Sequence, residues 1–423
     1  MLSNWRWKLL QISRRLWVRA TLIGMLGVLA ALVAAFGQEL IPWNLEGQIG
    51  AQAVDDILNI IASSMLAVTT FSLSVMTAAF SAATNNVTPR ATKLLMQDQV
   101  TQNVLATFIG SFLFALVGIV MLKTGLYGNH GRMILFVATI AVIALIVITL
   151  IRWIDHLSQL GRVGETTDRV EAATRKAVDA YLETPFLGGH RRDDDFEAPK
   201  SAIGIRSFVT GYIQHIDTQG LSKCVEALDA KCYLDVLPGG FVHPARTLLF
   251  LDGPAEVDDD VRRTIVDCFD IAPERSYDQD PRFGFAVLSE IASRALSPAV
   301  NDSGTAIDVI GRQTRLLADL AENAQGIDTD KEVALPLLHV PTISYKDLFD
   351  DAFNIIARDG ADRIEVQIRL QKALHALTQI GDASFRACAK EQARLALERA
   401  LEAMSSAQDA ARLREATAVL EQS

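Results

Sequence analysis

Residues 56–84 read DILNIIASSMLAVTTFSLSVMTAAFSAAT, and this stretch decides the fold of the chain. Small or polar side chains recur in it every three or four residues, and most other positions are apolar. The recurring set, which we call the polar stripe, is Asp56, Asn59, Ser63, Ala67, Thr70, Ser74, Thr77, Ser81 and Thr84. This spacing predicts one face of an α-helix. The helix is apolar enough for a bilayer, where a polar group is costly unless it meets a partner or water.

Three further apolar runs, at 20–36, 103–122 and 133–151, approach or reach membrane length, because about 20 helical residues span the hydrocarbon. Together with residues 57–82 they predict four transmembrane helices. The rest of the chain is charged and shows both strand-like and helical patterns. The predicted fold class is therefore a membrane protein with a four-helix transmembrane region and an α+β cytoplasmic domain. That domain has a small β-rich module and a helical C-terminal part.

Basic residues set the predicted orientation. Arg14, Arg15 and Arg19 precede the first span, Arg90 and Lys93 follow the second, and the loop at 37–56 has acidic residues but no Lys or Arg. The positive-inside rule then places both termini on the cytoplasmic side of the membrane. A cleaved signal peptide is the weaker alternative for the first span. A formal net charge of −10 argues against nucleic acid as a partner.

The composition predicts a sequence of segments along the chain. They are an interfacial helix at 1–19, the four-span domain at 20–154, a cytoplasmic helix and linker at 155–200, the small β-rich module at 201–255, an α/β segment at 256–342 and a C-terminal helical segment at 343–423. Within the module, strands are expected at 207–213 and 231–237. The mixed charges of Arg191–Asp195 indicate a solvated part of the linker.

The sequence offers no coherent active site. It has no phosphate loop, dinucleotide fingerprint or nucleophile elbow, and no pair of histidines has metal-ligand spacing on one element. Asp258, Asp259 and Asp260 precede a helical run and are expected to cap it. The charged segment 275–285 could bind a cation, but caps and salt bridges explain it more simply. We therefore expect no enzyme activity, no bound metal and no cofactor.

Several short motifs together are similar to those of a known family. They are Thr69–Ser81 followed by Thr88-Pro89-Arg90, Gly211-Tyr212-Ile213-Gln214 with Ile216-Asp217, Pro238-Gly239 with Phe241-Val242, Gln279-Asp280-Pro281 with Phe283-Gly284, Ala295-Leu296-Ser297-Pro298, and Asn301-Asp302 before Thr305-Ala306. The chain resembles bacterial predicted inner-membrane proteins that carry a domain-of-unknown-function label. The resemblance implies a multi-pass membrane protein and supplies no activity.

Two interpretations of the polar stripe remain open. In the first, a ring of copies turns its stripes to a common axis and forms an ion channel. Its pore-lining residues would be Asp56, Asn59, Ser63, Thr70, Ser74, Thr77, Ser81 and Thr84. In the second, the hydroxyls hold helices together in a non-conducting scaffold or sensor whose cytoplasmic domain binds a partner. The partners expected are the lipid bilayer, further copies of the chain and, for a channel, ions.

Overall fold

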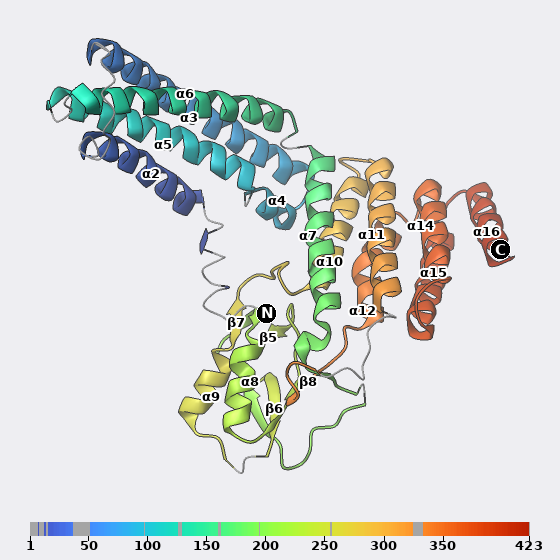
Figure 1. Ribbon diagram of the computed structural model, residues 1–423. Helices are drawn as coiled ribbons and strands as arrows, with labels where there is room; N and C mark the ends of the chain where they lie inside the picture. Colours follow the sequence, from blue (N-terminus) through green and yellow to red (C-terminus); the bar gives the residue numbers. More distant parts are fainter. Residues whose placement is uncertain are drawn as a thin grey trace. The chain divides into compact units, whose positions relative to one another are not determined.

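The computed structural model describes residues 7, 12–13, 16–36, 51–96, 98–125, 129–159, 162–193, 195–253, 256–324 and 333–422 (Figure 1). The chain divides into two compact units, which are treated separately below. The membrane unit comprises residues 8–85 and 92–166, and the α+β unit comprises residues 1–7, 86–91 and 167–423.

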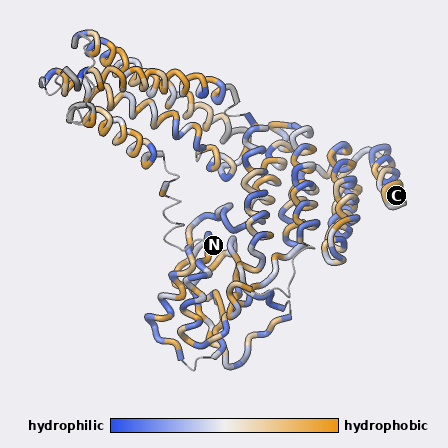
Figure 2. Tube along the Cα trace, in the orientation of Figure 1, coloured by the Kyte–Doolittle hydropathy of each residue, from blue (hydrophilic) through white to orange (hydrophobic). Residues whose placement is uncertain are grey.

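Four helices of the membrane unit carry its apolar segments: α2 (Leu16–Phe36), α3 (Ala51–Asn86), α5 (Gln99–Lys123) and α6 (Asn129–Gln159). The short helix α4 (Pro89–Met96) lies between α3 and α5 in the sequence. In the described residues, Gln52–Ala82, Gln99–Lys123 and Gly131–Leu157 are long and apolar enough to cross a membrane. The apolar part of α2, Val18–Val33, is shorter. Figure 2 shows how strongly apolar these helices are.

Helix α5 lies at the centre of this unit and packs closely on α2. A Cβ atom built on Gly27 would lie 2.5 Å from the carbonyl oxygen of Gly110, so the two backbones touch at these glycines. Ala106, Ser111 and Ala115 are buried on the same helix. Small residues such as these let two helix backbones approach closely.

A polar network joins the start of α5 to the end of α6. Asp98 caps α5 by accepting a hydrogen bond from the Thr101 backbone N–H at 2.8 Å. Its Oδ2 atom lies 2.8 Å from His156 Nε2, and the His156 ring stacks on Trp153 with centroids 5.8 Å apart. Because these side chains are largely buried, the network fixes the register of the two helices.

The α+β unit contains two sheets. The larger has the order β1 (His190–Arg191), β8 (Leu338–Val340), β4 (Lys231–Leu234), β6 (Thr247–Asp252) and β2 (Ile203–Arg206). The smaller has the order β5 (Phe241–Val242), β3 (Gly211–Ile216) and β7 (Phe269–Ala272). Strand β8 pairs in parallel with both β1 and β4. The sheets thus add strands from 190–191, 269–272 and 338–340 to those of the expected module at 201–255.

One strand that was predicted from the sequence does not form as a single strand. Residues 207–213 were predicted as a single strand, but β2 ends at Arg206 and β3 begins at Gly211. The Ser207 hydroxyl donates to the Val209 carbonyl at 2.7 Å, and this local bond forms a turn. Phe208 and Val209 are therefore exposed, at 56% and 51%, instead of alternating across a sheet.

Helices make up the rest of the unit. They are α7 (Val163–Glu183), α8 (Thr218–Ala227), α9 (Asp259–Val266), α10 (Pro281–Leu296), α11 (Ser303–Ala324), α12 (Tyr345–Phe349), α13 (Ile355–Asp359), α14 (Ile364–Leu377), α15 (Ala383–Ala403) and α16 (Ala407–Gln422), with short turns η2 (Pro185–Gly188) and η3 (Asp350–Asn354). Helices α10, α11, α14 and α15 pack in succession (Figure 1). The described residues from Tyr345 onward are helical, as expected.

The N-terminal interfacial helix expected at 1–19 falls mostly outside the described residues. Trp7, which is described, is buried and belongs to the α+β unit. Its ring stacks on His215 of β3, with centroids 5.1 Å apart and an interplanar angle of 5°. The first residues of the chain therefore contribute at least one side chain to the core of the sheet region.

Candidate functional site

The polar stripe lies along one exposed face of α3. Every member of the stripe, from Asp56 to Thr84, is exposed in the protomer. A second set of α3 residues is buried in the core of the membrane unit: Val54, Leu58, Ile61, Met65, Ser72 and Met76. Four of these six residues, Val54, Ile61, Met65 and Ser72, each precede a stripe position by two residues, which is about 200° around an α-helix. Most of the packed face therefore lies on the side of α3 opposite to the stripe.

The hydroxyls of the stripe bond to their own helix. Ser63, Thr70, Ser74, Thr77 and Thr84 each donate to the carbonyl four residues earlier, with oxygen–oxygen distances of 2.8, 2.9, 3.0, 2.9 and 2.8 Å. This bond satisfies the hydroxyl proton and leaves the oxygen lone pairs free to accept. The exposed face consequently offers a line of hydrogen-bond acceptors.

A polar cleft lies in the α+β unit. We call it the arginine cleft, after four of its lining residues, Arg192, Arg246, Arg275 and Arg282. Its volume is about 530 Å³. The rest of the lining comes from the loop 235–241, the start of α10, the loop 340–344 and the end of α7 with η2. Residues far apart in the sequence meet there because β8 inserts between β1 and β4.

Two of the arginines share one carboxylate. Arg192 Nη1 lies 3.6 Å from Asp235 Oδ1, and Arg246 Nη2 lies 3.2 Å from Asp235 Oδ2. Arg192 also donates to the Leu234 carbonyl at 2.6 Å. The linker that contains Arg192 was expected to be solvated, and for this residue the expectation is wrong: its side chain is 17% exposed. Parallel pairing of β1 with β8 holds the linker against the sheet.

The third arginine holds the start of α10. Arg275 donates Nε and Nη2 to the two carboxylate oxygens of Asp280, at 2.7 and 3.0 Å. The same carboxylate caps α10 by accepting from the Phe283 backbone N–H at 3.2 Å. Burial raises the pKa of Asp280, and the hydrogen bond from Arg275 offsets only part of that effect. The segment 275–285 thus forms the cap and salt bridge that its sequence predicted.

The fourth arginine ties α10 to the C-terminal helices. Arg282 donates to Asp347 at 2.6 Å and to Asp351 at 2.7 Å. Burial lowers the pKa of Arg282, but the two carboxylates outweigh burial and leave the pKa raised. Arg282 therefore stays charged and fixes one wall of the cleft.

The arginine cleft was not predicted from the sequence. Arg275, Arg282 and Arg192 fall in two separate segments noted for their charge, whereas Arg246 belongs to a segment with no distinctive motif. The four positions share no spacing, and long-range strand pairing alone brings them together. In the described residues, no group of three or more His, Cys, Asp or Glu could hold a metal ion. Asp258 caps α9 as expected, accepting from the Val261 N–H at 2.8 Å.

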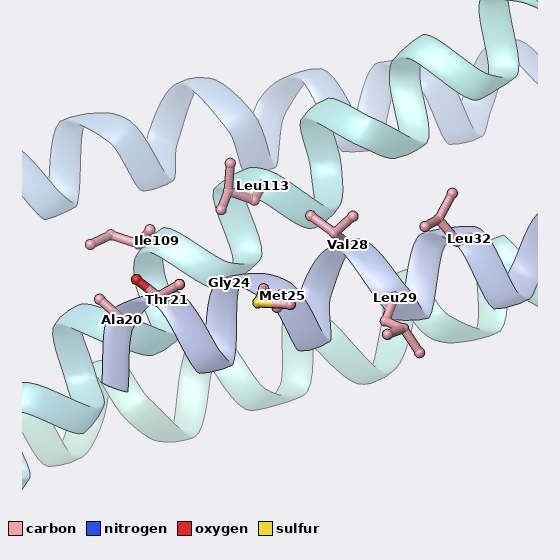
Figure 3. Close-up of a pocket in the computed structure, with 9 residues that line it drawn as sticks. All are labelled: Ala20, Thr21, Gly24, Met25, Val28, Leu29, Leu32, Ile109 and Leu113. Carbon is pink, nitrogen blue, oxygen red and sulfur yellow. The ribbon is translucent and has the colours of Figure 1, made fainter. Parts of the chain in front are cut away.

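A second hollow is apolar and belongs to the membrane unit. It lies between α2 and α5, and Thr21 is the one polar residue among those that line it (Figure 3). Gly24 faces Leu113 there, and a Cβ atom on Gly24 would lie 2.9 Å from Leu113 Cδ1. This groove has no chemistry beyond apolar contact, and we therefore take the polar stripe and the arginine cleft as candidate sites.

Comparison with known proteins gives a family but no activity. A family model described as predicted membrane protein (DUF2254) matches residues 13–376. The chain is similar to uncharacterised proteins of Mycobacterium bovis and Mycobacterium tuberculosis, each 26% identical over 217 residues. The matched part is 50% of this chain and 42% of each relative, so it spans less than half the length of those curated relatives. No solved structure matches the chain.

Proposed function

We propose that this chain, which belongs to the family of predicted membrane proteins (DUF2254), forms a homo-oligomeric ion channel lined by α3. The observation that carries the proposal is the exposure of the entire polar stripe in one protomer. In the described membrane unit, the other helices pack on the opposite face of α3 and leave the stripe uncovered. Lipid is a poor environment for such a row of polar groups. Copies around a common axis would turn the stripes toward each other and toward water.

The repeat of the stripe fits such a ring. Its members recur with a seven-residue period, whereas a straight α-helix drifts by about 20° per heptad against that period. We expect the α3 helices to supercoil or tilt, which keeps the stripe on the axis over the length of the membrane. Asp56 would lie at one mouth of the pore and Thr84 at the other.

The chemistry of the stripe favours cations. Hydroxyl protons are held by the helix backbone, so the oxygen lone pairs are available to an ion. Such oxygens can replace part of a cation's hydration without binding it strongly, as conduction requires. Asp56 adds a negative charge at its end of the stripe. We therefore expect potassium or sodium to pass in preference to chloride.

A non-conducting scaffold or sensor is the second candidate function, in which copies bury their stripes against one another. The back-bonded hydroxyls also suit this arrangement, because their donors need no partner on another helix. The arginine cleft would then be the part of the protein that binds a partner. Pore formation and a dry contact between stripes differ in whether water reaches α3.

Ion flux distinguishes the two. The full chain is reconstituted in lipid vesicles and potassium efflux is measured, with oligomer content determined by native mass measurement. Thr77→Leu places a bulky apolar group on the stripe in every copy, which creates a hydrophobic constriction that excludes water. Val75→Leu, off the stripe and half-buried, is the control. The channel predicts loss of flux in Thr77→Leu alone, with oligomers intact. Intact Thr77→Leu oligomers that conduct like wild type would contradict it.

A further inference from the structure

We propose that the arginine cleft is a binding site for a small molecule of the nucleotide class, with its phosphate or pyrophosphate held by Arg192, Arg246 and Arg275. This inference is independent of the pore, because all the residues involved belong to the α+β unit. The cleft lies in the size range of about 300–1,000 Å³ that is usual for small-molecule sites.

The charge in the cleft is the first argument. Its lining contains four guanidinium groups, those of the named arginines, and three carboxylates, those of Asp235, Asp280 and Asp347. The remaining lining residues are uncharged. The arginine cleft therefore has an excess of positively charged side chains, although the formal net charge of the chain is −10. Arginine clusters of this kind recognise phosphate, because the planar guanidinium donates two parallel hydrogen bonds to its oxygens.

Unused donors are the second argument. Arg246 makes its hydrogen bonds and its ion pair through Nη2, and Arg275 makes its hydrogen bonds through Nε and Nη2. Arg192 makes its hydrogen bond and its ion pair through Nη1, which leaves Nη2 for a ligand. An anion in the cleft would supply acceptors to these three side chains.

The rings in the cleft wall point to more than a bare phosphate. Tyr181, Phe186 and Phe241 line it together with the arginines. Phe241 is 54% exposed, so its ring is available to a ligand in the cleft. Phe186 has a backbone φ of +51°, a left-handed conformation that costs energy in a residue with a side chain. Aromatic faces stack on flat bases, so a nucleotide would use both parts of the lining.

Binding is measured by titration calorimetry on the full chain in detergent, with inorganic pyrophosphate, adenosine diphosphate and adenosine as probes. We expect pyrophosphate to bind, the diphosphate to bind more tightly, and adenosine to bind much more weakly than either. Arg246→Gln should weaken diphosphate binding about tenfold or more, because a charge-assisted hydrogen bond is lost. The matched control is Arg263→Gln on α9. The Arg263 side chain is 70% exposed, so this substitution should change binding by less than about twofold.

A variant that is expected to tighten binding separates an effect on the ligand from an effect on folding. Asp235 competes with the ligand for Arg192 and Arg246, so Asp235→Asn should tighten binding of the diphosphate several-fold while thermal unfolding confirms an intact unit. A purely structural ion-pair network would give no such gain. The proposal is overturned if neither pyrophosphate nor the diphosphate binds at millimolar concentration, if Arg263→Gln weakens binding as much as Arg246→Gln, or if Asp235→Asn fails to tighten it.

Discussion

Gly239 lies directly against the carboxylate of Asp280: a Cβ atom built on Gly239 would be 2.1 Å from Asp280 Oδ2. Gly239 also has a φ of +87°, which favours glycine. The turn before β5 is therefore built around the buried cap of α10. This contact joins two segments, Pro238-Gly239 and Gln279-Asp280-Pro281, that were recognised separately in the sequence as family motifs.

Gly239→Ala should destabilise the α+β unit by roughly 2–4 kcal/mol, because the new methyl group clashes with Asp280 and the backbone is strained. Denaturant unfolding in detergent measures this loss. Gly204→Ala is the control, since a Cβ atom there would lie 3.5 Å from Thr247 Cγ2, an ordinary contact. Equal stability of the two variants would show that the turn is not tied to Asp280.

Gly27→Ala should loosen the packing of α2 on α5. The added methyl group would meet the Gly110 carbonyl at 2.5 Å, so the helices must separate. We expect a lower thermal midpoint in detergent, with a cost of about 1–3 kcal/mol. Gly164→Ala, where a Cβ atom would have nothing within 4 Å, should be neutral or slightly stabilising. An unchanged midpoint for Gly27→Ala would contradict the close crossing.

Asp302 should make the stability of the α+β unit depend on pH in the acid range. It caps α11, and hydrogen bonds from the Thr305 hydroxyl and backbone lower the pKa of its carboxyl. Because the folded pKa lies below the unfolded one, the stabilisation is present above about pH 4 and is lost as the pH falls through the folded value.

Asp302→Ala removes both the helix cap and the titrating carboxyl group. It should cost about 1 kcal/mol at pH 7, the usual value of a helix cap, and should flatten the acid side of the stability curve. Asp302→Asn should keep most of the cap and also flatten the curve, because its amide does not titrate in this range. Urea unfolding at pH 7 and pH 3 measures both. If the stability of Asp302→Asn depended on pH as steeply as that of wild type, Asp302 would be ruled out as the source of the pH dependence.

Much of the fold follows from local sequence signals. The apolar runs form helices, three of them long enough to cross a membrane in the described residues, and the heptad spacing of the stripe lies on one helix. The expected cap at Asp258 and the cap in the segment 275–285 also depend on residues close together in the chain. The turn at 207–210 was missed because a single hydroxyl bond, from Ser207, interrupts an apolar run that otherwise resembles a strand.

The arginine cleft could not be predicted in the same way. Arg192 and Arg282 are separated by whole strands and helices, and they line one cleft because β8, from near residue 340, enters the sheet between β1 and β4. No periodicity encodes that pairing. The sequence likewise defined the stripe but not its exposure, which depends on which face of α3 packs on the other helices.

The central claim is that water reaches the stripe of α3 but not its other exposed residues. Single cysteines are introduced into a background in which the half-buried native thiols, Cys224 and Cys388, are replaced by alanine. Vesicles containing the full chain are then treated with a membrane-impermeant thiol reagent, and the rate of modification is measured at each position.

The decisive comparison is between stripe positions and lipid-facing positions that are also exposed in the protomer. Ser63→Cys, Ser74→Cys and Thr77→Cys should react, whereas Phe71→Cys and Ala78→Cys should not, although both of these positions are exposed and Phe71 is 64% exposed. A pore makes this pattern because it admits water to one face of α3 only. Equal rates at all five positions, or modification confined to the lipid-facing pair, would contradict an aqueous path along the stripe.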